Sequence, residues 1–302
     1  MMKKLMDSFA LLALLSLFAL ASACGDSSNA GPGGAGGAAG TGGTAGSGGS
    51  AGSGGVGGQS AVNECDDPLL NDCTDLATCV DTEAGFECQC DFPYIDTGDG
   101  CRQVKVLVLD DTGAPGNSVV VSLQNADFDA IDGPLYYEWD GVDPSLDGMD
   151  VVLSLEGYDY GYELTPEAQA AVQAFVAAGH GFIRTEWGLE EGIYLDPPLM
   201  PAIYEGDYDY GSTWTTINDP THPLARGITV PVVSEAAYCF ISLVGEGVSV
   251  IENEFGFPIV SYTTEHGGTT VHLNHDAHYT TDPVEDEALT LYQNAVHFAA
   301  TP

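Results

Sequence analysis

Positive charge is nearly absent from this sequence. Its 302 residues include 6 Lys and Arg against 45 Asp and Glu, which gives a formal net charge of −39. Proteins that bind nucleic acid need clustered Lys and Arg to neutralise phosphates, so this balance excludes nucleic acid as a partner. Such a surface attracts cations and cationic partners, and it is also typical of proteins that work in high salt.

A long apolar run is also missing. The stretch Phe9–Ala21 is shorter than the roughly 20 residues that a membrane-spanning helix needs. It lies between a short positively charged start and small residues, an order that predicts an export signal over residues 1–23. The sequence ASAC at 21–24 resembles the lipobox of bacterial lipoproteins, which implies a diacylated Cys24 that tethers the chain to a membrane. Plain secretion with an unmodified Cys24 is the alternative.

Residues 24–60 have almost no large apolar side chains. They consist mainly of Gly, Ala, Ser and Thr, which cannot bury enough surface to offset the entropy of folding. The segment is therefore expected to be a flexible linker with a reach of roughly 30–35 Å. With Cys24, it predicts an extracytoplasmic lipoprotein anchored at the outer membrane or cell surface.

Cysteines are few but concentrated. Six of the eight lie in a segment too short to build a core of its own, and in an exported chain this favours a disulfide framework. A zinc site is less favoured, because such sites more usually have two C-x-x-C pairs. Six cysteines allow 15 pairings, and their spacing does not choose among them. The six are Cys65, Cys73, Cys79, Cys88, Cys90 and Cys101.

Three motifs in this segment resemble a calcium-binding EGF-like domain over residues 61–102. They are N-E-C at 63–65, C-x-D-x-x-x-x-F-x-C at 79–88 and C-x-C at 88–90. The resemblance implies the disulfides Cys65–Cys79, Cys73–Cys88 and Cys90–Cys101. It also implies calcium ligands, which are the carboxylates of Glu64 and Asp81 and the backbone carbonyls of Val62, Thr82 and Gly85.

This ligand set suits calcium, which takes six to eight oxygen ligands in flexible geometry. The family usually has a further carboxylate at the position of Ala61, so this chain offers one ligand and one charge fewer. A module that has kept its fold and lost its metal is therefore the alternative to calcium binding.

Residues 103–302 alternate apolar strands with helices. The runs 104–110 and 150–155 are continuously apolar, as strands of parallel sheets are. A helix is predicted from the Thr165 cap and Pro166 to Gly179. This alternation predicts an α/β domain with a mostly parallel sheet and a flavodoxin-like three-layer arrangement. Further helices are expected over 117–128 and 284–298, and further strands over 136–139, 181–185 and 270–274.

Three phrases in this part, at 165–183, 221–228 and 267–276, resemble the class I glutamine-amidotransferase-like superfamily. The similarity is greater to its branch without glutaminase chemistry, which includes ThuA-like and β-galactosidase trimerisation-type domains. In active glutaminases a Cys stands on the turn after the strand that corresponds to 181–185, whereas residues 185–188 here read TEWG. Amide hydrolysis needs an activated nucleophile, so we expect a domain that binds a ligand and is not an enzyme.

Candidate site residues follow the predicted strands. The resemblance places His275 and Asp276 where the family carries its catalytic His and acidic partner. Glu186 and Trp187 follow another strand, and the carboxyl ends of parallel strands meet at one edge. One interpretation is a carbohydrate site with Trp187 as a stacking platform. A second is a glycosidase-like pair of Glu186 and Asp276, and a third is a vestigial cleft with solvated side chains.

Two similar segments, 156–161 and 205–211, are rich in Asp and Tyr and are expected in loops. Tyr158 in the first is a candidate for an acidic and aromatic rim that binds a sugar or a cation, and solvated loops are the alternative. The sequence thus predicts a calcium-binding, surface-anchored lipoprotein whose α/β domain binds a carbohydrate or protein partner. An extracytoplasmic carbohydrate-active enzyme that uses Glu186, His275 and Asp276 is the alternative.

Overall fold

The structure is a computed structural model, and the residues that it describes lie within the unit Gln59–Pro302. Cys24, Val62, Tyr158 and Asp276 lie outside the described residues, and Glu186 is described through its backbone alone. No helix within the described part of the chain is long and apolar enough to cross a membrane. The described residues are 63–67, 69–83, 85–112, 118–156, 162–189, 199–275 and 286–301.

Disulfides hold together the first part of this unit. Its three bonds join Cys65 to Cys79, Cys73 to Cys88 and Cys90 to Cys101, which confirms the pairing that the resemblance implied. No residue of its first three elements is buried, so cross-links replace a hydrophobic core there. The elements are η1 (Glu64–Asp66), β1 (Ala77–Thr82), β2 (Gly85–Cys90), β3 (Ile95–Asp96) and β4 (Cys101–Arg102).

The rest of the unit is built on one nine-stranded sheet with the order β10-β9-β11-β12-β13-β8-β7-β5-β6. The strands are β5 (Lys105–Asp110), β6 (Asp129–Leu135), β7 (Val151–Ser154), β8 (Gly181–Thr185), β9 (Ala202–Ile217), β10 (Val232–Leu243), β11 (Val248–Asn253), β12 (Pro258–Thr263) and β13 (Thr270–Leu273). The helices are α1 (Ser118–Asn125), α2 (Pro166–Ala177) and α3 (Asp286–Ala300), with short 3-10 turns η2 (Glu186–Leu189) and η3 (Pro223–Ala225).

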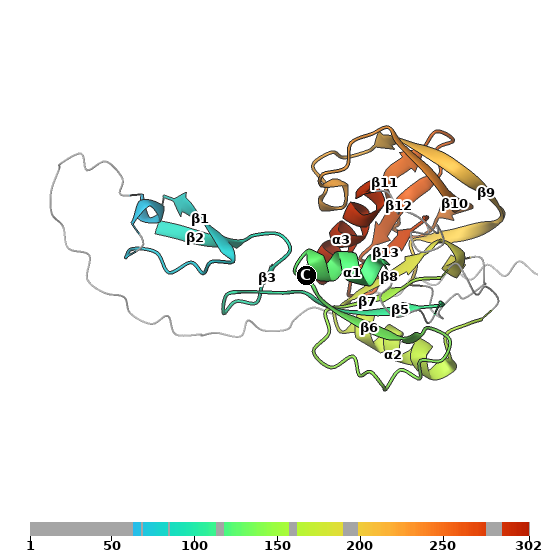
Figure 1. Cartoon of the computed structure of the whole chain (residues 1–302), viewed down its shortest axis with the longest axis horizontal. Coiled ribbons are helices and arrows are strands. Elements are labelled where there is room, and N and C mark those ends of the chain that lie inside the picture. The colour runs from blue at the N-terminus through green and yellow to red at the C-terminus, as the bar shows by residue number, and fades with distance from the viewer. Residues whose placement is uncertain are drawn as a thin grey trace, which may run out of the picture. The chain divides into compact units, whose positions relative to one another are not determined.

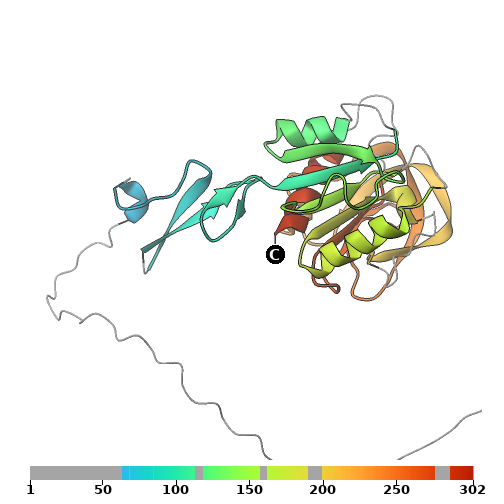
Figure 2. The same cartoon turned by 90° about the horizontal axis from the view of Figure 1, so that it is seen from below.

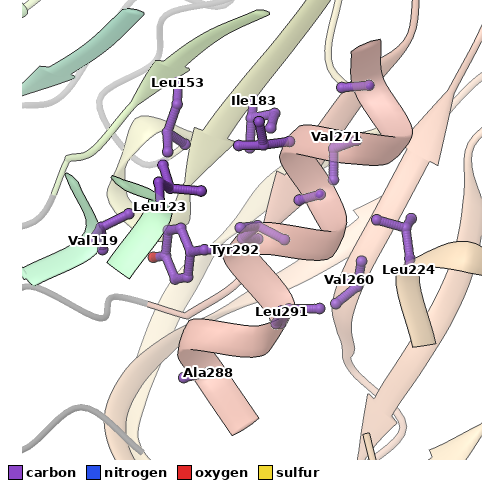
Figure 3. Packing of buried hydrophobic residues seen from close by; sticks show 14 of the residues in the cluster. Val119, Leu123, Leu153, Ile183, Leu224, Val260, Val271, Ala288, Leu291 and Tyr292 are labelled. Atoms are coloured by element: carbon purple, nitrogen blue, oxygen red, sulfur yellow. The ribbon is translucent and has the colours of Figure 1, made fainter. Parts of the chain in front are cut away.

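Helices cover both faces of the parallel strands (Figures 1 and 2). Successive side chains of a strand point to opposite faces. In β5, Val106 and Val108 accordingly join the core beneath α1 and α3, whereas Leu107 and Leu109 join the core beneath α2. Figure 3 shows the first of these cores, where side chains of α1 and α3 pack with the sheet residues Leu153, Ile183 and Val271.

The sheet is mixed, which corrects the expectation of a mostly parallel one. The strands β6, β5, β7, β8 and β13 pair in parallel, whereas every pairing among β9 to β13 on the other side is antiparallel. Only residues 254–257 separate β11 from β12. A parallel pair needs a crossover of a dozen or more residues, so such a short connection forces antiparallel pairing.

Two local expectations are also wrong. The segment 136–139, expected to be a strand, forms a turn after β6, with Tyr136 and Trp139 buried against the α2 side of the sheet. The segment 205–211, expected to be a loop, lies inside β9. By contrast, the predicted cap of α2 is confirmed, since the Thr165 Oγ1 accepts a hydrogen bond of 3.1 Å from the Ala168 N–H.

Candidate functional site at the carboxyl edge of the sheet

The parallel strands end at a common edge, where α/β folds place their ligands. Glu156 follows β7, the turn η2 follows β8, and Asn274 and His275 follow β13. The edge therefore gathers residues that lie more than a hundred positions apart in the sequence.

The hairpin of β9 and β10 crosses this edge. At one end Ala202 and Ile241 belong to the core beneath α2, and at the other end Trp214 and Val232 belong to the core beneath α1 and α3. Figure 1 shows β9 as a long, curved strand at this side of the sheet. Because the hairpin reaches from one layer to the other, its middle faces the ends of β8 and β13.

Asn274 fastens the hairpin to the edge. Its Oδ1 accepts a 2.8 Å hydrogen bond from the Cys239 N–H, and its Nδ2 donates to the carbonyls of Cys239 at 2.8 Å and Pro258 at 2.9 Å. Asn274 is fully buried, so these bonds form away from water, where leaving them unmade is costly. Cys239 is buried and forms no disulfide, in agreement with its position in an apolar strand.

A buried ion pair supports the turn after β8. The Arg184 Nε and Nη2 donate to the Glu156 Oε1 and Oε2 at 2.6 and 2.5 Å, and both side chains are fully buried. The Ser154 hydroxyl donates to the same Oε1 at 2.6 Å. A Cβ on Gly188 would lie 2.6 Å from the Arg184 Nε, so the turn η2 rests directly on the ion pair and only glycine fits there.

Thr185, the last residue of β8, carries the one hydroxyl group of the segment 185–188, and this hydroxyl already bonds to the backbone. It accepts a 2.8 Å hydrogen bond from the Glu156 N–H and donates to the Glu156 carbonyl at 3.1 Å. Thr185 is fully buried by its neighbours. Its side chain therefore connects β8 to the end of β7, which leaves it a structural role.

Three aromatic side chains form a row along the hairpin, which we call the aromatic row: Trp187, Tyr208 and Tyr210. The Trp187 and Tyr208 ring centroids lie 4.8 Å apart, and those of Tyr208 and Tyr210 lie 5.7 Å apart, both in edge-to-face geometry. The exposed fraction rises from 7% at Trp187 to 40% at Tyr208 and 57% at Tyr210. The structure thus joins Trp187 to the Tyr-rich segment that the sequence had kept separate.

Acidic residues occupy the alternate positions of the same strand. Asp207 and Asp209 lie between the tyrosines of β9 and are exposed. Tyr238 pairs with Asp209 across the hairpin, and burial, followed by the charges of Asp209 and Glu254, raises the pKa of its phenol. The hairpin therefore has an aromatic face toward the edge and an acidic face away from it.

His275 lies farther along the hairpin than Trp187. Its Nε2 lies 2.9 Å from the Ser234 Oγ, and its ring packs perpendicular to Trp214 with the centroids 5.4 Å apart. Trp214 and Tyr208 are six residues apart on one strand, which corresponds to roughly 20 Å. Trp187 and His275 consequently line two different parts of the edge.

The predicted calcium ligands Glu64 and Asp81 lie on elements joined by the Cys65–Cys79 disulfide, whose Cα atoms are 5.6 Å apart. Neither carboxylate has a hydrogen-bond or ion-pair partner among the described residues, so both remain available to a cation, and in this respect the residues fit calcium. The Gly85 carbonyl accepts a hydrogen bond of 3.0 Å from the Thr82 hydroxyl. The described residues contain no cluster of three or more His, Cys, Asp or Glu that would hold a metal by themselves.

Sequence reasoning missed Ser234, Trp214, Arg184 and Asn274. Ser234 and Trp214 lie in strands that carry no recognisable motif, and a buried arginine looks like a surface one in a sequence. Asn274 is adjacent to the predicted His275, and this adjacency is the sequence feature that could have pointed to it.

No protein-family model and no curated protein matches the sequence. Solved structures are similar in fold. A cytoplasmic protein of Salmonella typhimurium matches with a TM-score of 0.53 at 15% identity, covering 66% of this chain and 100% of its own. A second cytoplasmic protein, from Salmonella typhimurium LT2, matches with a TM-score of 0.52 at 12% identity, covering 65% of this chain and 99% of its own.

A protein described as ThuA-like, from Parabacteroides merdae, matches with a TM-score of 0.50 at 12% identity, covering 66% of this chain and 91% of its own. Identities this low establish the fold and not the activity. The large domain of this chain therefore has the fold of ThuA-like proteins.

Proposed function

We propose that this chain is an extracytoplasmic lipoprotein anchored through Cys24, in which a calcium-binding EGF-like module joins the linker to a ligand-binding, flavodoxin-like α/β domain. Three disulfides support an oxidising compartment, because such bonds persist mainly in exported proteins. The order 2-1-3-4-5 of the parallel strands β5 to β8 and β13 supports the flavodoxin-like arrangement.

Calcium binding rests on the two free carboxylates of Glu64 and Asp81 and on carbonyls around the β1–β2 turn. Calcium is a hard cation that prefers oxygen ligands, so its binding would hold η1 close to this hairpin. Titration calorimetry of the mature chain with calcium is expected to give saturable heat in the millimolar range. The double variant Glu64→Gln, Asp81→Asn should lose it, whereas Glu83→Gln, an exposed carboxylate on the same hairpin, should keep it. Absence of heat in the wild type would leave the module as a structural spacer.

The aromatic row carries the proposal that the α/β domain binds a carbohydrate. Sugars stack their apolar faces on aromatic rings, and Tyr208 and Tyr210 are exposed at the carboxyl edge where this fold places its ligands. The Thr185 hydroxyl, just before the turn η2, is engaged by the Glu156 backbone, which favours binding over amide hydrolysis at this place.

A glycan array with the mature chain tests this function. We expect Tyr210→Ala to weaken binding to the selected glycan about tenfold, which corresponds to about 1.4 kcal/mol for one lost stacking contact. Phe255→Ala is the matched control, because Phe255 is an equally exposed aromatic residue outside the row. Equal effects of the two variants would contradict the proposal. If the chain hydrolyses a chromogenic glycoside and Glu186→Gln abolishes this activity, the domain is a carbohydrate-active enzyme and not a binding domain.

A further inference from the structure

Ser234 and His275 form a close pair at the edge of the sheet. The Ser234 Oγ lies 2.9 Å from the His275 Nε2, within the distance that joins a nucleophile to its general base. The two residues are 41 positions apart in the sequence and come from β10 and from the end of β13. Both are 2% exposed, so the contact is shielded from competing water.

The backbone around Ser234 holds its hydroxyl in place. The pairing of β10 with β9 shifts between Ser234 and Ala237, which is a β-bulge, and bulges often orient side chains next to active sites. Within the bulge the Ala236 N–H donates a 3.1 Å hydrogen bond to the Ser234 Oγ. With one lone pair engaged in this way, the hydroxyl proton is free to point to the imidazole.

The base is positioned as firmly as the hydroxyl. Asn274, next to His275, binds the backbone of Cys239 on the same β10, and the Tyr292 hydroxyl donates a 3.0 Å hydrogen bond to the His275 carbonyl. Two neighbouring residues of one loop thus contact one strand. These bonds hold β10 and the end of β13 at a constant separation, which maintains the distance between Ser234 and His275.

A buried hydrogen-bond donor lies beside the pair. Trp214 is 0% exposed, its ring packs against His275, and its Nε1 finds no acceptor among the described residues. A buried N–H without a partner costs free energy, so such a group is typically satisfied by a bound water or a ligand. This orphan donor is independent of the Ser–His contact and points to a ligand oxygen at the same place.

We propose that Ser234 and His275 are a nucleophile and general base that hydrolyse esters of small carboxylic acids, with Trp214 as a donor to the ester carbonyl oxygen. The Ser234 Oγ attacks the carbonyl carbon while its proton moves to the His275 Nε2, and the same proton then leaves with the alcohol as the ester C–O bond breaks. A water molecule, deprotonated by the His275 Nε2, then attacks the acyl-serine; the bond between the Ser234 Oγ and the acyl carbon breaks, the proton passes from His275 to the Ser234 Oγ, and the carboxylic acid leaves. No oxidant, reductant or further reactant is needed.

The surroundings define the substrate. Ser234, His275 and Trp214 are each 2% exposed or less, which admits only a small acyl group. The strongly negative chain repels the carboxylate product and favours a neutral ester. Tyr208, Tyr210, Ser212 and Trp214 occupy alternate positions of β9, so one face of the strand leads from the exposed aromatic row to the pair. Insofar as the ester is carried by a sugar bound to this row, the inference rests on the proposed function.

A fluorophosphonate probe tests the pair directly, because it forms a stable bond with an activated serine. We expect the folded mature chain to take up one probe on the peptide that contains Ser234, located by mass spectrometry, and to hydrolyse p-nitrophenyl acetate. Ser234→Ala and His275→Gln should each slow labelling and hydrolysis on the order of 100-fold or more. Ser261→Ala, which removes a buried hydroxyl from β12, is the matched control and should keep wild-type rates.

Absence of labelling in the folded wild type, or an adduct on another residue, would overturn the assignment. Mapping the adduct in the wild type also decides the matter if Ser234→Ala does not fold, and thermal unfolding shows which variants are folded. Glycan binding reports on the aromatic row, whereas labelling by a probe that carries no sugar reports on the Ser–His pair. Failure of the aromatic row and failure of the Ser–His pair therefore give different results.

Discussion

At the residue scale, Arg184 and Glu156 form the most deeply buried ion pair that the structure describes. Both side chains are fully buried and bonded through two atoms each, whereas the Arg102–Asp150 pair, of the same bidentate geometry, leaves its arginine 42% exposed. Burial of an ion pair removes the hydration free energy of both charges, and the attraction between the charges compensates for this loss. When one partner is removed, the other charge stays buried without compensation. The two pairs thus provide a comparison of bidentate ion pairs that differ in burial, with Arg184 bound through Nε and Nη2 and Arg102 through Nη1 and Nη2.

We predict that Arg184→Met lowers the free energy of unfolding by about 3–5 kcal/mol, because it leaves the Glu156 carboxylate buried without a counter-charge. Urea unfolding measures this loss. Arg102→Met is the control, with an expected loss of about 1 kcal/mol or less for a partly exposed pair. Similar losses in both variants would show that burial does not decide the contribution of the Arg184–Glu156 pair.

His297 connects stability to pH. Burial, assisted by the nearby charge of Arg226 and opposed by a hydrogen bond to the Tyr94 carbonyl, lowers the pKa of His297 below its ordinary value of 6.5. The unfolded chain therefore binds the proton more readily than the folded chain. The contribution of His297 is fully present above pH 6.5 and is lost as the pH falls from there through the lowered folded-state pKa.

We predict that the melting temperature falls between pH 7.5 and pH 5.5, and that His297→Gln makes this fall smaller. Circular dichroism melts at three pH values measure both. Some dependence should remain in the variant, because burial also lowers the pKa of His222. A variant whose melting temperature follows pH as steeply as that of the wild type would contradict the assignment.

At the scale of elements, the hairpin of β9 and β10 determines what the carboxyl edge looks like. It places the aromatic row at the end of β8 and Ser234 at the end of β13. The connection that holds it across the edge is Asn274, whose side chain satisfies three backbone groups in a buried position. The position of the hairpin should therefore depend on this one amide.

We predict that Asn274→Ala lowers the free energy of unfolding by about 2–4 kcal/mol, because it leaves buried backbone groups of Cys239 and Pro258 without partners. Hydrogen exchange should show faster exchange at the Cys239 amide. Asn218→Ala is the control, since the Asn218 Nδ2 also contacts several acceptors but is exposed to water. An unchanged Cys239 exchange rate would mean that strand pairing alone holds the hairpin.

At the scale of the whole molecule, the last loop of the disulfide-rich part packs on the large domain. Phe92 contacts Phe128 and His297, with ring centroids 5.9 and 5.0 Å apart, and the Arg226 guanidinium lies 4.7 Å from its ring centre. Ile95 is buried in the core beneath α1 and α3. The loop between Cys90 and Cys101 thus contributes to the stability of the α/β domain.

We predict that replacing Cys90 and Cys101 by Ala lowers the stability of the α/β domain by about 2–3 kcal/mol, because the open loop gains chain entropy when it unfolds. All three tryptophans, Trp139, Trp187 and Trp214, lie in this domain, so their fluorescence reports its unfolding. Replacement of Cys73 and Cys88 is the control and should leave this transition in place. Equal shifts from both pairs would contradict a special role for the last loop.

Local patterns were sufficient for several parts of this protein. The resemblance to an EGF-like domain implied the three disulfide pairings, the cap at Thr165 predicted the start of α2, and continuous apolar runs predicted β5 and β7. Each of these features arises from residues that are close in the sequence or that follow a known motif. The same patterns failed for 205–211, where Asp, Tyr and Gly are typical of loops but the partner strand β10 makes a long strand of β9.

The sequence by itself thus determined the disulfide framework, the buried parallel strands and the strongly acidic character of the chain. Only the tertiary structure decided that the sheet is mixed, that Arg184 is buried against Glu156, and that Ser234 meets His275. These contacts join residues 28 and 41 positions apart. The first depends on the parallel pairing of β7 with β8 and the second on how the hairpin crosses the sheet edge, and no local periodicity or propensity encodes either.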